Sequence, residues 1–450
     1  MPLPAPYRRE IKATLMLAGP IVVTQLAHIS LSFVDTVMVG RLGPDALAGV
    51  ALGNTIFFNT LIFCMGVLMA VGPMVSHSFG ADDHDAVGRS VRQGLWLAAS
   101  LSIPAFAFIY HGGFFLSLAG QTPENVALAG AYLRAIGWGI FPFLGFIALR
   151  SFIEAVSRPK AVTFIAIFGV GLNIGLNYVL MFGKMGFPEM GLVGTGWAST
   201  CVYSFNFLVL LAYVGWQKAF KEYHIFSKLG RPDGHYFNEL FRIGWPIGAS
   251  IGIETSLFMA TVIMMGWIGT SQLAAHQVAV QCAAFTFMVP LGIGMATSVR
   301  VGQAMGKKDF SGVSVAGFTG MGISVTFMCA TALLFFFAPR WLVSLYLEMD
   351  VPANQAVIAL AVKLLALAAL FQIVDGIQVV ALAALRGMKD TRVPMVLAVI
   401  SYWGFGLVIG YVLAFKFGQG ETGLWWGLVL GLAAASILLT RRFYKKSHLS

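Results

Sequence analysis

Hydrophobic residues in this chain form long runs that few charges interrupt. Uncharged runs such as residues 94–123, 313–339 and 393–415 exceed the roughly 20 residues that an α-helix needs to cross about 30 Å of hydrocarbon. This pattern predicts an all-α polytopic membrane protein. Hydropathy predicts about twelve transmembrane helices, at residues 13–38, 48–76, 93–118, 127–152, 161–183, 192–215, 241–266, 275–299, 313–338, 355–384, 393–416 and 422–440.

Composition supports the same class of protein. Hydrophobic residues make up 58% of the chain and charged residues only 11%, whereas soluble domains carry about 25% charge. The partner that surrounds the helices is therefore a lipid bilayer. No cleavage site follows the first hydrophobic run, so we expect that run to be retained as an anchor.

The formal net charge is +10, which on a soluble protein would suggest nucleic acid as a partner. Here the basic residues lie at the termini and in alternate loops, so they indicate orientation, and we expect no nucleic acid partner. The opposite loops contain only Arg41, Lys184, Arg340 and Lys416. This asymmetry predicts that both termini are cytoplasmic.

The two halves of the chain are related by an internal repeat. A shift of 226 residues aligns Pro20 with Pro246, and later aligns Gly43 with Gly269 and Asp83 with Asp309. Each half then holds six predicted helices, so the halves are parallel pseudo-repeats, an arrangement typical of transporters that rock between two states.

The repeat also predicts the domain boundaries. We expect an N-terminal six-helix lobe at residues 1–216, a cytoplasmic linker at 217–240 and a C-terminal six-helix lobe at 241–450. The linker is rich in basic residues, including Lys228 and Arg231, and Gly and Pro break its secondary structure.

Three acids lie inside apolar helices: Asp35, Glu254 and Asp375. A charge at a helix centre costs about 2.5–3.5 kcal/mol on insertion scales, so such acids face a protein interior or a water-filled cavity. Asp35 belongs to a polar stripe with Gln25, His28, Ser32 and Thr36. It is a candidate proton carrier or sodium ligand, and the alternative is a structural hydrogen-bonding acid.

Amide and hydroxyl side chains accompany Asp35 in the first half. Asn173 and Asn177 are four residues apart, so they project from one helix face, and Ser199 belongs to the next predicted helix. Oxygen ligands of this kind suit a hard cation such as Na⁺. Interhelical hydrogen bonding would explain the two Asn residues equally well.

In the second half, Glu254 and Asp375 lie on different helices. Gln277 and Gln281, next to His276, are four residues apart, while Gln372 and Gln378 flank Asp375. These side chains would solvate a metal ion or a bound organic cation, or else simply pack between helices. The acids are not repeat mates, because Asp35 aligns with Thr261 and Glu254 with His28, so we expect each lobe to have its own chemistry.

Four stretches of the sequence resemble the MATE (multidrug and toxic compound extrusion) transporters, in particular their NorM-like branch. They are LAGPIVVTQLAHISLSFVDTVMVGRLG, NIGLNYVLMFG, AAHQVAVQ and LRGMKDTRVPM. The resemblance implies a MATE-like fold and a monomeric antiporter of the bacterial inner membrane. Such an antiporter exports lipophilic organic cations in exchange for Na⁺ or H⁺, without a cofactor.

The resemblance also implies binding residues. Asp35, Asn173, Asn177 and Ser199 match the amino-lobe cation site of the family, where Ser199 replaces a frequent Thr. Glu254 and Asp375 match acids of the carboxy lobe, so sodium ligands are expected among Asp35, Asn173, Asn177, Glu254 and Asp375. Phe371 stands where some relatives carry Tyr, and it offers no oxygen to a cation.

Other functions fit the residues less well. A lipid-linked oligosaccharide flippase of related architecture is the alternative, but it would need a basic cavity, whereas the intramembrane charges here are mainly acidic. An enzyme is not expected, because the chain has no H-E-x-x-H motif and its His residues are scattered. No phosphate-binding G-x-x-x-x-G-K-[ST] motif is present, which argues against an ATP-driven pump.

Overall fold

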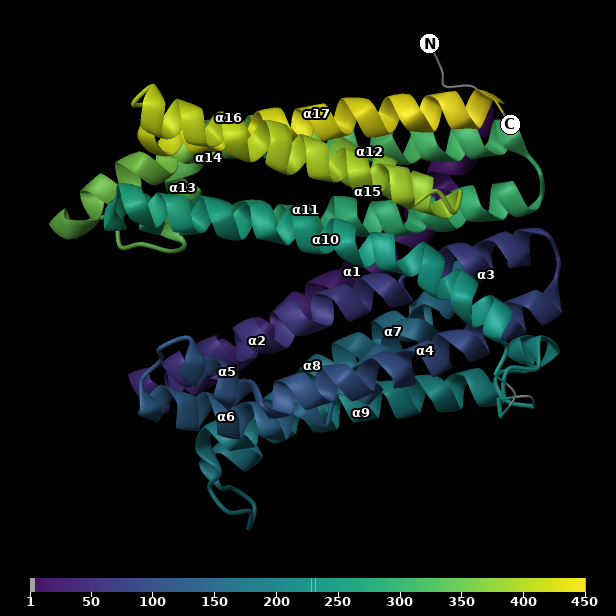
Figure 1. Ribbon diagram of the computed structural model, residues 1–450, viewed down its shortest axis with the longest axis horizontal. Helices are drawn as coiled ribbons and strands as arrows, with labels where there is room; N and C mark the ends of the chain where they lie inside the picture. Colours follow the sequence, from purple (N-terminus) through teal and green to yellow (C-terminus); the bar gives the residue numbers. More distant parts are fainter. Residues whose placement is uncertain (1–4, 228, 231, 450) are drawn as a thin grey trace. The chain divides into compact units, whose positions relative to one another are not determined.

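The computed structural model describes residues 5–227, 229–230 and 232–449, so Lys228 and Arg231 of the predicted linker lie outside the described residues. These ranges contain helices and no strand. The helices are α1 (Ala5–Gly40), α2 (Pro44–Leu68), α3 (Val71–Gly80), α4 (His84–Tyr110), α5 (Gly112–Leu118), α6 (Pro123–Gly137), α7 (Ile140–Ala155), α8 (Lys160–Phe182), α9 (Gly191–Trp216), η1 (Lys218–Tyr223), α10 (Gly234–Ile268), α11 (Thr270–Gly306), α12 (Phe310–Phe337), α13 (Pro339–Ser344), η2 (Pro352–Asn354), α14 (Gln355–Gly387), α15 (Arg392–Val399), the π-helical η3 (Ile400–Leu407), α16 (Val408–Tyr411), the π-helical η4 (Val412–Lys416) and α17 (Gly420–Leu449) (Figure 1).

The prediction of about twelve membrane-spanning helices is confirmed. In the described part of the chain, eleven helical segments are long and apolar enough to cross a bilayer, and α6 and α7, which meet at a 49° bend, make a twelfth if they are taken as one span. The bend lies at Gly139, whose missing Cβ would be 3.2 Å from the Cα of Thr200 on α9. The bend therefore accompanies close packing of α9 against this helix pair.

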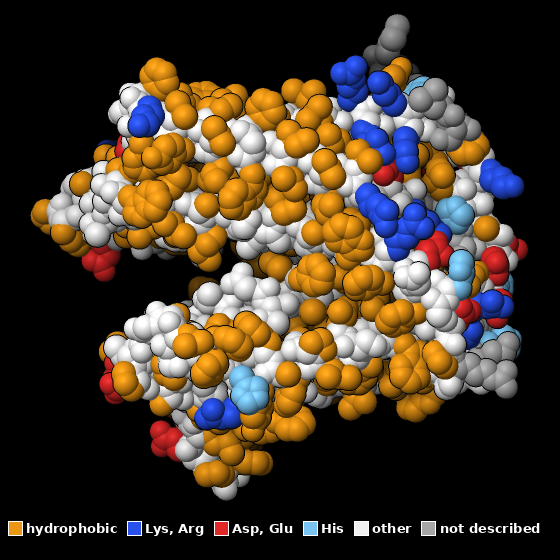
Figure 2. All heavy atoms as spheres, viewed as in Figure 1, with side chains coloured by type: hydrophobic (Ala, Val, Ile, Leu, Met, Phe, Trp, Pro, Cys, Tyr) orange, Lys and Arg blue, Asp and Glu red, His pale blue; other side chains and the backbone are white. Residues whose placement is uncertain are grey.

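The outer flanks of the helices are apolar. Large side chains such as Phe33, Ile103 and Phe164 are each at least two-thirds exposed. Orange side chains cover the helix flanks in Figure 2, whereas Lys, Arg, Asp and Glu gather at helix ends. This distribution matches a hydrocarbon surround, because lipid replaces water around the flanks and the charged groups reach the polar interface.

The repeat is visible in the helix boundaries. Pro44–Gly80, comprising α2 and α3, corresponds at a shift of 226 residues to α11, Thr270–Gly306, and α4 and α12 begin at His84 and Phe310. The turns before α4 and α12 match too, since the Asp83 and Asp309 carboxylates each accept a backbone hydrogen bond from the residue three positions later.

The chain forms two compact units, residues 1–22 with 249–450, and residues 23–248. We refer to residues 23–248 as the N-terminal unit and to the other as the C-terminal unit. Their boundaries, after Val22 and after Gly248, obey the same 226-residue shift. They differ from the predicted lobes at the first helix of each half, because the start of α1 belongs to the C-terminal unit and the start of α10 to the N-terminal unit.

Close backbone packing explains this exchange of segments. In the N-terminal unit, a Cβ on Gly66 of α2 would lie 2.4 Å from the Cα of Gly248 on α10. In the C-terminal unit, a Cβ on Gly292 of α11 would lie 3.1 Å from the Cα of Val22 on α1. Small residues allow such approach in membranes, so each starting segment packs against the second helix of the other half.

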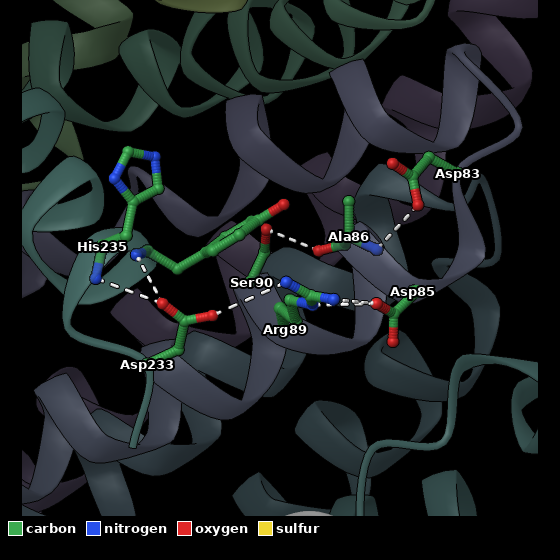
Figure 3. Close-up of polar contacts among 8 residues, drawn as sticks. Asp83, Asp85, Ala86, Arg89, Ser90, Asp233 and His235 are labelled. Carbon is green, nitrogen blue, oxygen red and sulfur yellow. Dashed lines mark hydrogen bonds and ion pairs between the residues drawn. The ribbon is translucent and has the colours of Figure 1, made fainter. Parts of the chain in front are cut away.

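The linker between the halves is held on the N-terminal unit. Arg89 of α4 donates from Nε to Asp85, 2.8 Å away, and its guanidinium also lies 3.8 Å from the Asp233 carboxylate (Figure 3). Asp233 accepts a hydrogen bond from the backbone of His235 at the start of α10. Arg92 donates to the carbonyl of His224. Exposed ion pairs contribute little stability, so these contacts mainly position the linker.

Glycine packing in the C-terminal unit gives a stability prediction. A Cβ on Gly427 of α17 would lie 2.4 Å from the Cα of Gly410 and 2.6 Å from the carbonyl oxygen of Gly406. We expect Gly427→Ala to lower the free energy of unfolding by about 1–3 kcal/mol, as overpacking generally does. Thermal unfolding in detergent measures the change. Gly322→Ala, with nothing within 4 Å, is the matched control, and equal stability of the two variants would contradict the prediction.

Candidate functional site

In the N-terminal unit, Asp35 lies at a meeting point of three helices. Its carboxylate accepts hydrogen bonds from Asn177 Nδ2 on α8 at 2.6 Å and from Ser199 Oγ on α9 at 3.2 Å. The amide nitrogen of Asn177 also lies 3.1 Å from Asn173 Oδ1. All four side chains are buried. The structure thus brings together the four residues that were predicted as the amino-lobe cation site.

The side chains that hydrogen-bond to Asp35 offer oxygen atoms and no positive charge. The hydrogen-bond partners of Asp35 are neutral, and it forms no ion pair with a described residue. Asn177 Oδ1 and Thr195 Oγ1 are buried and have no hydrogen-bond partner in the described part of the chain. Thr195 lies one helical turn before Ser199. A buried carboxylate with neutral neighbours and spare oxygen acceptors suits a proton or a hard monovalent cation.

Asp35 faces a cavity of about 150 Å³. This volume is below the 300–1,000 Å³ that is usual for pockets holding drug-sized ligands, so the cavity as it stands fits ions and water, and an organic cargo would enter only after the helices around it move apart. Besides the predicted stripe on α1, its wall includes Tyr132, whose hydroxyl donates to Asn54 Oδ1 at 2.8 Å. The lining residues are Gln25, His28, Leu31, Ser32, Asp35, Asn54, Phe58, Met65, Tyr132, Phe143, Ile147, Arg150, Asn173, Ser199, Val202 and Tyr203.

A second buried charged group reaches this cavity, and the sequence reasoning missed it. Arg150 on α7 donates from Nε to Glu154 Oε1 at 2.7 Å and from its terminal nitrogen to Gln25 Oε1 at 2.7 Å. Both charged side chains are buried. The signal was present in the sequence, since Arg150 and Glu154 are opposite charges four residues apart within an apolar run.

In the C-terminal unit, Glu254 on α10 and Asp375 on α14 line one cavity, also of about 150 Å³. Asp375 is buried, and its Oδ1 has no hydrogen-bond partner among the described residues. The rest of the wall is apolar and aromatic: Phe258, Val280, Ala283, Ala284, Phe287, Phe371 and Trp425. The two acids that the sequence placed on separate helices therefore share one cavity.

Phe371 belongs to the aromatic wall of this second cavity. Its ring packs edge-to-face against Phe258 and Trp425, with centroids 6.1 Å and 5.8 Å apart. It offers the two acids a hydrocarbon neighbour and no oxygen. A cation in this cavity would therefore depend on Glu254 and Asp375 for its charge compensation.

The glutamines of the second half fall into two groups. Gln277 and Gln281 are exposed on α11 and do not line the cavity of Glu254 and Asp375, so their role at a cation or substrate site stays a prediction. Gln372 and Gln378 are buried instead. Gln372 accepts a hydrogen bond from Thr286, and Gln378 donates to the Tyr402 hydroxyl. A spacing of four residues places side chains on one face but does not say which way that face points.

One sequence motif of hydrolases occurs without its structure. Residues 248–252, Gly-Ala-Ser-Ile-Gly, match G-x-S-x-G. That motif exposes its Ser on a sharp strand-to-helix turn, whereas here all five residues lie within α10. A nucleophile elbow is therefore not formed at these residues.

The geometry can be compared with known proteins. The family model described as MatE matches residues 20–179 and 246–412. A probable multidrug resistance protein NorM of Mesorhizobium japonicum is 43% identical over 446 residues, which is 99% of this chain and 96% of that protein. The protein of the same name in Pseudomonas aeruginosa is 39% identical over 443 residues, 98% of this chain and 91% of its own.

Solved structures share the fold. The eukaryotic MATE transporter AtDTX14 has a TM-score of 0.87 at 22% identity, covering 98% of each chain. An outward-facing multidrug resistance MATE family transporter of the MOP superfamily has a TM-score of 0.89 at 18% identity, covering 98% of this chain and 96% of that one. At these sequence identities, the similarity shows only that the fold is shared.

Proposed function

Because the chain belongs to the MATE family of membrane transporters, we propose that it exports lipophilic organic cations, drugs among them, in exchange for Na⁺ or H⁺. The names of its bacterial relatives, probable multidrug resistance proteins, support a multidrug cargo. They also support a bacterial inner membrane as its location. Both termini on the cytoplasmic side and a monomeric state are part of the same proposal.

The observation that carries the proposal is the buried Asp35 with neutral partners. A carboxylate in a low-dielectric interior is costly unless a positive charge or a proton neutralises it. Na⁺, H⁺ and a cationic cargo can each supply that neutralisation. Two cations that compete for one negative site cannot both occupy it, and this competition is the simplest physical basis of antiport.

The state of Asp35 can also bias the conformation of the helices around it. A neutralised carboxylate tolerates dry helix packing, whereas a charged one requires water or a ligand, so the two forms have different affinities for inward-open and outward-open arrangements. A ligand shifts such an equilibrium only through its differential affinity for the two states. Exchange of the coupling ion for cargo at Asp35 would then shift the protein between its inward-open and outward-open states, which is rocking-bundle alternating access.

The choice between Na⁺ and H⁺ rests on the oxygen atoms near Asp35. Asn173, Asn177 and Ser199 supply amide and hydroxyl oxygens, which favour Na⁺ when they can converge on the ion. A carboxylate that is buried without such ligation works as a proton carrier. The acids of the second cavity, Glu254 and Asp375, are proposed as a second cation or cargo site.

Phe371 offers a direct test of the second site. We expect Phe371→Tyr to place an additional oxygen at the wall beside Glu254 and Asp375 and to tighten Na⁺ binding there by about tenfold, the effect of one added charge-assisted ligand. Isothermal titration of purified protein with Na⁺, in a background lacking the carboxylate of Asp35, isolates this cavity. Leu370→Met, at an exposed neighbouring position, is the control. Unchanged affinity would remove Glu254 and Asp375 from the proposed sodium ligands.

The experiment that tests the proposal is export of a fluorescent lipophilic cation from energised vesicles that contain the protein. A Na⁺ gradient at fixed pH is imposed in one arm, and a pH gradient without Na⁺ in the other. Export that depends on Na⁺ alone supports ligation by carboxylate and amide oxygens, and export that depends on the pH gradient alone supports a titrating carboxylate. Absence of export in both arms would reject the proposal.

The alternative of an oligosaccharide flippase is not favoured. Such cargo is anionic through its lipid-linked phosphate, and a matching cavity would carry an excess of positive charge. Here the first cavity contains Asp35 together with a paired Arg150, and the second contains Glu254 and Asp375. No observation in the described structure supports an anionic cargo.

A further inference from the structure

Arg150 adds a permanent positive charge to the cavity of Asp35. Its guanidinium does not lose its proton in proteins, so this charge persists whatever occupies the cavity. Arg150 lines the cavity, whereas its ion-pair partner Glu154 does not. We infer that Arg150, held by Glu154 and Gln25, restricts the cargo of this cavity to molecules with a single cationic group. This inference rests on the proposed export of organic cations.

The two charges contact different parts of the polar stripe on α1. Arg150 donates to Gln25, at one end of the stripe, and Asp35 stands ten residues further along the helix. At 1.5 Å per residue Gln25 and Asp35 are about 15 Å apart along the helix axis. His28 lies between them and packs edge-on against Phe146 of α7, with ring centroids 6.2 Å apart. The cavity is therefore polarised, with a carboxylate at one end and a guanidinium at the other.

Charge compensation limits what the cavity can hold. Glu154 cancels the charge of Arg150 overall, since the pair is in direct contact at 2.7 Å and buried. Asp35 then remains as one uncompensated negative charge. One monovalent cation, one proton or one cationic cargo group neutralises it, and a second cationic group would add an unpaired positive charge to a buried space.

The orientation of the pair strengthens this restriction. Because the guanidinium faces the cavity and the carboxylate of Glu154 lies outside its lining, the second charge of a dication would meet the positive end of the pair. The matching cargo has one cationic centre at Asp35 and an uncharged remainder toward Arg150. Aromatic walls such as Phe58, Phe143 and Tyr203 are suited to the apolar body of such a molecule.

Competition binding with two matched probes tests the inference. One probe is an alkyl triphenylphosphonium monocation, and the other is a bis-triphenylphosphonium with two such centres on one alkyl chain about 15 Å apart. Each competes with a fluorescent monocation for binding to the purified protein in detergent. The protein used also carries Glu254→Gln and Asp375→Asn, which remove both carboxylates from the second cavity. With Arg150 and Glu154 intact we expect the monocation to bind roughly tenfold more tightly, as repulsion between two like charges about 12 Å apart at an effective dielectric near 20 predicts.

The decisive variant removes both members of the pair. In R150Q/E154Q the net charge of the cavity is unchanged, so the monocation should bind within about twofold of its affinity for the intact pair, whereas its advantage over the dication should disappear. Replacement of a buried ion pair as a unit is commonly tolerated. If this variant does not fold, R150M/E154M replaces it, with side chains of similar volume. In E154Q alone the unpaired guanidinium remains, so monocation binding should weaken about fivefold or more.

The chain offers a matched control in D85N/R89Q. This pair has the same spacing of four residues and the same charges, but lies at the start of α4 outside the cavity (Figure 3). It should leave the preference for the monocation unchanged. Equal binding of the two probes with the pair intact, or an unchanged preference in R150Q/E154Q, would overturn the inference while leaving cation export standing. If neither probe binds to the protein that carries Glu254→Gln and Asp375→Asn, while the protein with Glu254 and Asp375 intact binds the monocation, the inference is overturned and cation export stands. If the protein with all its acids also binds neither probe, the proposed function fails together with the inference.

Discussion

Asp35→Asn is expected to reduce gradient-driven export of a lipophilic cation by at least about thirtyfold, because loss of one buried charge partner costs about 2–5 kcal/mol and 1.4 kcal/mol corresponds to tenfold. The amide oxygen of Asn can still accept from Asn177, and its amide nitrogen can donate to Ser199 Oγ in place of the second carboxylate oxygen, so the helix packing around position 35 is retained. What the variant lacks is the charge for which cation and cargo compete. Initial rates of dye export in vesicles, normalised to the amount of folded protein, measure the effect.

The control for this prediction is Asp45→Asn. Asp45 is an exposed acid in the first turn of α2, in the same unit of the chain. It makes the same chemical change without touching the cavity, so export should stay within about twofold of the unsubstituted protein, as exposed substitutions generally cost little. If Asp35→Asn exported as fast as this control, exchange at Asp35 would be ruled out.

Asp375→Asn is the second large expected effect. Asp375 is buried beside Glu254 with an oxygen that has no partner in the described structure, so the charge is available to a cation or cargo. We expect export to fall about tenfold or more, since a single acid, Glu254, would remain in an otherwise apolar wall. The same vesicle assay measures the rate, and Asp350→Asn, at an exposed position of the same unit, is the control.

The two acid variants together test the proposed coupling of ion exchange to cargo export more strictly than either variant does alone. Export that survived both Asp35→Asn and Asp375→Asn at the original rate would show that neither cavity couples an ion to cargo. Loss in one variant only would assign the coupling to that cavity. In that case the other acids would be left with a structural role, the alternative that the sequence already raised for Asp35.

The sequence was enough to predict which residues lie on the same helix and on the same face of that helix. The long apolar runs indicated the spans, and the regular shift between the halves indicated the repeat that the boundaries of α2–α3 and α11 reproduce. The high cost of a charge in hydrocarbon identified Asp35, Glu254 and Asp375 as inward-facing. Because a helix returns to the same face every three to four residues, the spacing of Asn173 and Asn177 was enough to place them together.

Relations between helices were decided by the tertiary structure alone. The approach of Gly66 to Gly248 moves the start of α10 to the N-terminal unit, and no local pattern specifies which of the abundant glycines meet. Arg150 reaches Gln25 across 125 positions of the chain, and Gln277 lies on an exposed face although its spacing suggested a ligand. The sequence by itself determined which residues share a helix face, since backbone periodicity is local. Only packing decided what each face meets, since that depends on contacts between segments far apart in the chain.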